Sequence, residues 1–229
     1  LADAMAYQGK ARGEISKQMQ EAILFAANPI DHTISPGQIR AEAVNRKEKA
    51  YPLVILTSSL GSKLGFDALD ALRKNDGQDE AATRATVTRT VNIFMAANQL
   101  PILQLADQTL VEAKERRSLD VKIKPAIEDS LQNLLQFYGE GIGEFRMKSK
   151  LIEEGVSERP TVVVLSDPND ILSYSWLKSP NRPEYATVDV VVSNDKTWLD
   201  LLENPGVAHT GYFEQPYISE ILMNGYIGK

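Results

Sequence analysis

A serine, a pair of aspartates and a histidine follow three different short apolar runs of this sequence. The four side chains, with the runs that precede them, are Ser59 (LVIL, 53–56), Asp167 and Asp170 (TVVVL, 161–165) and His209 (VDVVV, 188–192). An imidazole can take the proton of a serine hydroxyl as general base, and a carboxylate can hold that imidazole in one tautomer. This combination is typical of acyl transfer through a serine nucleophile, although a serine can also cap a helix and an aspartate can form a turn.

Steric requirements single out Ser59 among the serines of the segment TSSLGS (57–62). A nucleophile between a strand and a helix lies at the apex of a tight, strained turn, so the residues two before and two after it must be small. For Ser59 these neighbours are Thr57 and Gly61. Ser58 and Ser62 instead have leucine at both positions, which favours Ser59 as the nucleophile.

The elements around these residues alternate between strands and helices. Apolar residues at three- and four-residue spacing, together with Pro and Asp at element starts, predict helices at 13–27, 37–48, 62–73, 107–117, 125–137 and 215–224. Short apolar runs predict strands at 53–56, 91–95, 161–165 and 188–192, the first of them fully buried. The alternation predicts an α/β fold in which a mostly parallel sheet is flanked by helices, with the polar residues at its carboxyl edge.

Composition excludes several other classes of protein. The 229 residues contain no cysteine, which excludes a disulfide framework, a thiolate metal site and a cysteine nucleophile. The two histidines are far apart, so no metal site is expected, and no cofactor is implied. A net charge of −6 argues against broad nucleic-acid binding.

The chain has the features of a soluble globular protein, and its compartment is not indicated. The longest wholly apolar stretch, Ala22 to Ala27, is much shorter than the ~20 residues that span a bilayer. The first residues have neither the basic start nor the apolar run of a signal peptide.

The order Ser, Asp, His, each after a different strand, resembles that of serine α/β-hydrolases of the esterase or lipase type. The matching segments are 53–61 (the family's fifth strand and nucleophile elbow), 163–170 (its seventh strand and acid loop) and 190–209 (its eighth strand and histidine loop). The chain therefore resembles the C-terminal portion of such an enzyme. One departure is Thr57, which stands at the first glycine of the family's G-x-S-x-G elbow.

The resemblance implies a role for each residue. Ser59 would attack a carboxylic ester, of which a lipid is one candidate, and His209 would act as general base. Asp170 is preferred to Asp167 as the acid because two apolar residues follow it, as in the family. The N–H of Leu60 would donate to the oxyanion.

The resemblance also implies missing parts. The family has about four strands before its elbow, yet residues 1–50 contain no convincing strand. No residue is a candidate for the second oxyanion donor, which the family takes from the loop after its third strand. We therefore expect one domain, 1–229, whose N-terminal portion is missing, cleaved or supplied by a second chain, with residues 107–160 as a candidate cap or lid.

Three aromatic residues lie near the predicted triad along the sequence: Tyr174, Trp176 and Tyr212. They either line an apolar substrate pocket or simply pack in the core. Two alternatives to an esterase are a catalytically inactive hydrolase-like binding module and a doubly wound binding or nucleotide-handling domain in which the Ser, Asp and His residues are incidental. The latter predicts that Ser59 and His209 lie far apart.

Overall fold

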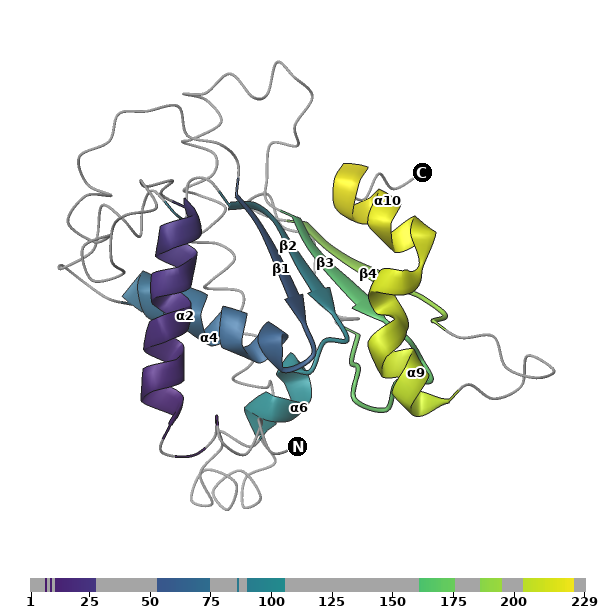
Figure 1. The fold of residues 1–229 in the computed structure, drawn as a ribbon, viewed down its shortest axis with the longest axis horizontal. Helices are drawn as coiled ribbons and strands as arrows, with labels where there is room; N and C mark the ends of the chain where they lie inside the picture. The colour runs from purple at the N-terminus through teal and green to yellow at the C-terminus, as the bar shows by residue number, and fades with distance from the viewer. Residues whose placement is uncertain are drawn as a thin grey trace, which may run out of the picture.

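Among the residues that the structure describes, four parallel strands form a central sheet, and helices cover both of its faces (Figure 1). The computed structural model describes residues 7, 9, 11–27, 53–74, 86, 90–105, 161–175, 186–194 and 204–224. The strands are β1 (Leu53–Ser58), β2 (Thr90–Ala96), β3 (Thr161–Ser166) and β4 (Ala186–Val191). The helices are α2 (Arg12–Ala27), α4 (Leu60–Lys74), α6 (Leu100–Leu105), α9 (Pro205–Thr210), the 3₁₀ helix η3 (Gly211–Glu214) and α10 (Pro216–Asn224). The α/β class with a parallel sheet is therefore confirmed.

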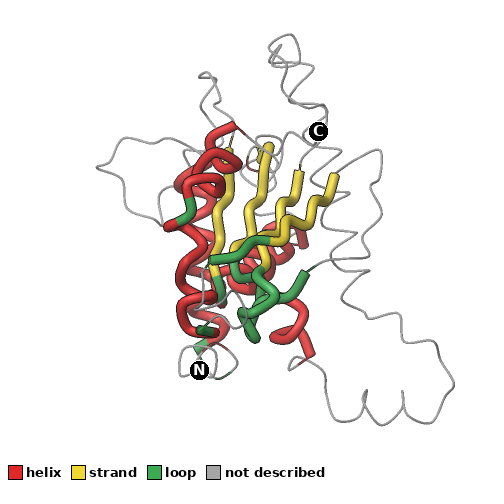
Figure 2. Tube along the Cα trace, turned by 90° about the vertical axis from the view of Figure 1, so that its right-hand side faces the viewer, coloured by secondary structure: helices red, strands yellow, loops and turns green. Residues whose placement is uncertain are grey.

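The strand register brings the carboxyl ends of the strands to one edge of the sheet. The spatial order is β1-β2-β3-β4, with Ser58 opposite Ala96 and Ser166 opposite Val191. In Figure 2 the described loops, in green, gather at the lower ends of the strands. Residues that directly follow different strands therefore become neighbours at this edge.

The alternation of side chains along each strand produces two apolar cores. Ile93, Met95, Val162 and Val164 pack with α2 and α4 on one face. Their sequence neighbours Phe94, Ala96, Val163 and Leu165 pack with Tyr212 and Ile218 on the other face. Because β2 and β3 are covered on both faces, both strands are apolar at nearly every inner position, with Asn92 of β2 as the exception.

Most predicted elements within the described ranges are confirmed, with boundaries that differ by a few residues. The helices expected at 37–48, 107–117 and 125–137, and the cap expected at 107–160, lie outside the described residues. The short helices α6 and α9 were not predicted. None of the described helices is long and apolar enough to cross a membrane.

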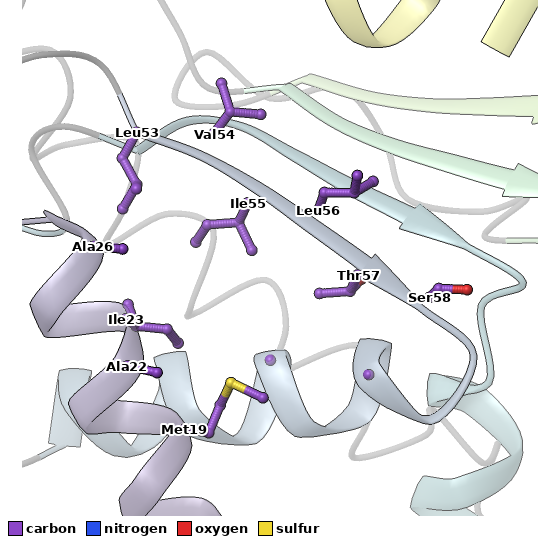
Figure 3. A pocket seen from close by; sticks show the side chains of 12 residues that line it. Met19, Ala22, Ile23, Ala26, Leu53, Val54, Ile55, Leu56, Thr57 and Ser58 are labelled. Atoms are coloured by element: carbon purple, nitrogen blue, oxygen red, sulfur yellow. The ribbon is translucent and has the colours of Figure 1, made fainter. Parts of the chain in front are cut away.

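The prediction that the first strand is fully buried is wrong. Val54 and Leu56 are each 49% exposed, and neither belongs to the apolar core on their face of the sheet. β1 is also an edge strand of the described sheet and pairs there only with β2. A groove of about 330 Å³ runs along β1 between the strand and α2. Figure 3 shows Leu53 and Ile55 pointing toward α2, whereas Val54 and Leu56 point to the opposite face of the sheet.

The approach of α4 to β1 depends on a glycine that sequence reasoning did not single out. A Cβ at Gly65 would lie 2.9 Å from Cγ2 of Thr57, a distance that real Cβ contacts do not tolerate. At Gly61, the expected small neighbour, the nearest atom would be Thr57 Cβ at 3.9 Å, an ordinary contact. The Thr57 hydroxyl donates to the Phe94 carbonyl at 3.1 Å, so its methyl group is directed at the helix. Gly65 is thus what accommodates a threonine in this turn.

We predict that Gly65→Ala destabilises the protein by ~1–3 kcal/mol, because the added methyl group would clash with Cγ2 of Thr57, a short side chain that cannot move away. Gly13→Ala in α2 is the matched control, since a Cβ there meets nothing within 4 Å and helix propensity favours alanine. The measurement is the free energy of unfolding by urea. Thr57→Ser removes Cγ2 and should restore stability to Gly65→Ala; a double variant as unstable as the single one would contradict this account.

Candidate active site

The backbone of Ser59 is strained and held in place by its neighbours. Ser59 lies between β1 and α4 and has a φ of 54°, in the left-handed region that residues other than glycine seldom adopt. Its N–H donates to the Ala96 carbonyl at 2.9 Å, which continues the β1–β2 pairing by one residue. The Ser62 hydroxyl donates to the Ser59 carbonyl at 2.7 Å. These contacts present the Ser59 side chain at the carboxyl edge of the sheet.

Ser59, His209 and Asp170 form a connected relay across three segments of the chain. Ser59 Oγ lies 2.9 Å from His209 Nε2. His209 Nδ1 lies 2.9 Å from Oδ2 and 3.0 Å from Oδ1 of Asp170. The Ser59–His209 distance contradicts the separation that a nucleotide-handling domain predicts. The carboxylate side chain is fully buried while the imidazole is 21% exposed, so the relay runs from the interior toward solvent.

His209 is positioned by a short helix rather than by the loop that the sequence suggested. Proline at the first position and the Asn204 side chain, which accepts from Gly206 N at 2.9 Å, start α9. The Asn194 side chain, which follows β4, donates to the Ala208 carbonyl at 2.6 Å. This bond ties the residue before His209 to the edge of the sheet.

The carboxylate of Asp170 is held by two donors in addition to the imidazole. The Leu172 N–H donates to Oδ1 at 3.0 Å, and the Tyr212 hydroxyl donates to Oδ2 at 3.2 Å. Each oxygen thus has a donor besides the ring, and a buried carboxylate requires such partners. The arrangement fixes the plane of the carboxylate against the ring.

Asp167, the alternative acid, has a structural role. It is 1% exposed, and its Oδ1 accepts from Asn169 N at 2.8 Å in the turn after β3. Its Oδ2 accepts from Asn194 N at 2.7 Å. Asp167 therefore joins the loops after β3 and β4, and it is Asp170 that contacts the histidine.

Tyr212, expected to line a substrate pocket, is instead 1% exposed and packs in the core. Its oxygen accepts from Asp167 N at 2.8 Å and donates to Asp170. Burial raises the pKa of the Tyr212 phenol well above its ordinary value, so the hydroxyl keeps the proton that it donates. This geometry gives Tyr212 the role of holding the acid, which its position near His209 in the sequence did not indicate.

The remaining candidate residues are Leu60, Tyr174 and Trp176. Leu60 is the first residue of α4, directly after the serine. Tyr174 is partly exposed, and its N–H donates to the Asn98 carbonyl at 2.9 Å. Trp176 lies outside the described residues. Among the described residues, no group of three His, Asp or Glu side chains is arranged to hold a metal ion.

Gln99 is a further polar residue at the site that sequence reasoning missed. Its side-chain amide nitrogen lies 2.9 Å from Ser59 Oγ, although 40 residues separate the two along the chain. No motif marks it, because it belongs to a polar pair between a strand and Pro101. Only the register of β1 against β2 brings it to the serine.

Comparison of the chain with models of known protein families, with curated proteins and with solved structures found no match.

We predict that Tyr212→Phe lowers the free energy of unfolding by ~1–3 kcal/mol, since Asp167 N is then buried without an acceptor and Asp170 loses a donor. Tyr217→Phe is the control: its hydroxyl donates to the Ser193 carbonyl at 3.3 Å from a residue that is 39% exposed. That variant should change stability by less than ~0.5 kcal/mol. Urea unfolding of both variants is the measurement, and equal losses would refute the special role of Tyr212.

Proposed function

We propose that the protein is a serine hydrolase that cleaves a carboxylic ester through an acyl-enzyme intermediate. The observation that carries this proposal is the relay Ser59–His209–Asp170, whose two links are both within hydrogen-bond distance. The left-handed φ of Ser59 at a strand-to-helix turn supports the same function, because that geometry exposes a nucleophile.

In the acylation half-reaction, Ser59 Oγ forms a bond to the ester carbonyl carbon. The hydroxyl proton passes to His209 Nε2, and the carbonyl π pair moves onto the carbonyl oxygen. Asp170 keeps the proton on Nδ1 and stabilises the imidazolium that forms. The tetrahedral intermediate then collapses, the bond to the alkoxy oxygen breaks, and His209 gives its proton to the departing alcohol.

In the deacylation half-reaction, water takes the place of the alcohol. His209 accepts a proton from the water as its oxygen attacks the acyl carbon. Collapse of the second intermediate breaks the bond to Ser59 Oγ, which recovers its proton from His209. The products are an alcohol and a carboxylic acid, and the site returns to its starting state.

The oxyanion would lie next to the N-terminus of α4. Leu60 is the first residue of this 15-residue helix, where backbone N–H groups have no partner within the helix and the helix dipole favours negative charge. We assign the Leu60 N–H as one oxyanion donor. A site of this kind uses two, and each is worth ~3–4 kcal/mol of transition-state stabilisation.

We further propose that the sheet belongs to an α/β-hydrolase-like fold, which would place an additional strand beside β1. Two observations support this proposal: β1 pairs only with β2 in the described sheet, and an apolar groove runs along its other side. The described strands would then correspond to the last four strands of such a sheet.

A catalytically inactive binding module is the second candidate. Thr57 favours it, because a β-branched residue stands where the hydrolase elbow has glycine. Reactivity of Ser59 separates the two candidates, since a binding module does not need an activated serine.

The experiment that tests this function is labelling of the full-length chain with a fluorophosphonate, followed by peptide mapping. We expect a label on Ser59 that disappears in Ser59→Ala and persists in the neighbouring variant Ser58→Ala. Ester substrates of increasing acyl length would then define the specificity. A folded wild-type protein that takes no label at Ser59 would favour the binding module.

The identity of the acid gives a second prediction. Asp170→Asn should slow labelling by about 10⁴-fold, because an amide no longer requires the proton on His209 Nδ1. In Asp167→Asn we expect lower stability but, once corrected for the folded fraction, a labelling rate within about tenfold of wild type. If Asp167→Asn were the slower of the two variants, the acid would have to be reassigned.

A further inference from the structure

The side chain of Gln99 approaches the reacting atom of the proposed site, yet the mechanism above does not use it. Its Nε2 lies 2.9 Å from Ser59 Oγ, and the residue is 8% exposed. A serine hydroxyl has one hydrogen to donate and two lone pairs to accept with. The imidazole of His209 and this amide therefore occupy two of these three hydrogen-bonding positions.

The direction of each hydrogen bond follows from the buried end of the relay. The carboxylate of Asp170 can only accept, so the single hydrogen of a neutral His209 ring lies on Nδ1. Nε2 is then an acceptor, and Ser59 must donate its hydrogen to it. Oγ can therefore only accept from Gln99, which requires the amide nitrogen rather than the amide oxygen to face the serine.

The backbone around Gln99 is fixed from two sides. The Gln99 N–H donates to Ser62 Oγ at 3.1 Å, and that hydroxyl donates to the Ser59 carbonyl. The preceding residue, Asn98, donates through its side chain to the Tyr174 carbonyl at 3.0 Å and accepts from Tyr174 N at 2.9 Å. The segment after β2 is thus bonded to both the nucleophile turn and the acid loop. These bonds do not involve the Gln99 side chain, so its substitution leaves them in place.

We propose that Gln99 maintains the hydrogen-bond direction that Asp170 imposes on the Ser59–His209–Asp170 relay and sets the direction from which a substrate is attacked. This inference rests on the proposed hydrolase function and adds a fourth residue to it. As a donor that cannot accept, the amide nitrogen prevents Ser59 from turning its hydrogen away from His209. It also keeps Oγ at the position from which proton transfer to Nε2 is direct.

The direction of attack follows from the tetrahedral arrangement about Oγ. One position holds the bond to Cβ, one the hydrogen directed at His209, and one the lone pair that accepts from Gln99. The remaining lone pair is the one that can form a bond to a carbonyl carbon. Orientation of this kind contributes to catalysis because only a near-attack geometry reacts.

Two substitutions test the inference through the rate of fluorophosphonate labelling and through kcat and KM for an ester. Gln99→Met keeps the length of the side chain without the donor, and we expect labelling and kcat to fall about tenfold with KM unchanged. Gln99→Glu presents an acceptor that competes with His209 for the hydroxyl hydrogen, and we expect a fall of about 100-fold or more. Gln18→Met in α2 is the control, because the Gln18 amide also donates one bond, at 3.0 Å to Glu14, on a helix that carries none of the relay residues. Its rates should stay within about twofold of wild type.

The pH dependence of Gln99→Glu separates this role from simple structural support. The introduced carboxyl group only accepts when it is deprotonated, whereas in its protonated form it can donate to Oγ as the amide does. The ratio of the variant rate to the wild-type rate should therefore rise as the pH falls through the titration of this carboxyl group. A ratio that is independent of pH would overturn the assignment.

Nitrogen NMR of the histidine ring tests the inference without reference to activity. The chain has two histidines, so His32→Gln leaves the ¹⁵N signals of His209 alone. In the protein with Gln99, the ¹⁵N chemical shift of Nε2 should be that of a nitrogen that accepts a hydrogen bond. In Gln99→Glu at high pH, it should be that of a nitrogen without a hydrogen-bond donor. Unchanged Nε2 shifts, or labelling that is unaffected by both substitutions, would refute the role of Gln99. Absence of labelling in the wild type would instead refute the hydrolase function, and the NMR result would then decide on Gln99 alone.

Discussion

The left-handed backbone of Ser59 is the constraint on which the rest of the site depends. Such a conformation costs ~1–3 kcal/mol and persists only where the surroundings determine it. Here the pairing of β1 with β2 supplies one restraint, through the bond from Ser59 N to the Ala96 carbonyl. The close packing of Thr57 on Gly65 supplies another, because it sets how near α4 can come to the strand. A turn fixed from both sides can present a serine side chain without adjustment when a ligand arrives.

The buried carboxylate of Asp170 imposes the second condition. An ionised group removed from water is unfavourable unless donors surround it, and here a backbone N–H, a tyrosine hydroxyl and an imidazole do so. Because burial raises the pKa of the Tyr212 phenol, this donor is retained even at a pH where an ordinary tyrosine begins to lose its proton. The position of the carboxylate in turn decides which ring nitrogen of His209 carries the hydrogen. The buried carboxylate thus determines that Nε2, at the exposed end of the relay, is the nitrogen that can accept the proton of Ser59.

Sequence reasoning recovered the parts of this arrangement that depend on local patterns. The strand from Val162 to Leu165 is apolar on both faces, and so is the strand from Val91 to Met95 except at Asn92, as the two cores require. Small neighbours identified Ser59 as the apex of a turn. The exposure of Val54 and Leu56 was not predicted, because an apolar run does not reveal whether both faces of its strand are covered. Gly65, Gln99 and the role of Tyr212 were also missed, since each depends on which segments the sheet register brings together.

The strand ends are coupled more tightly than the chain order suggests. The segment after β2 contacts the nucleophile turn through Gln99 and the acid loop through Asn98. The acid loop is joined to the segment after β4 by the bond from Asn194 N to Asp167, and Asn194 in turn holds the helix that carries the histidine. The three segments that carry Ser59, Asp170 and His209 are therefore joined by main-chain and amide hydrogen bonds as well as by the relay itself. Polar contacts of this kind, made where four parallel strands end together, explain how residues separated by 150 positions can hold a 2.9 Å distance.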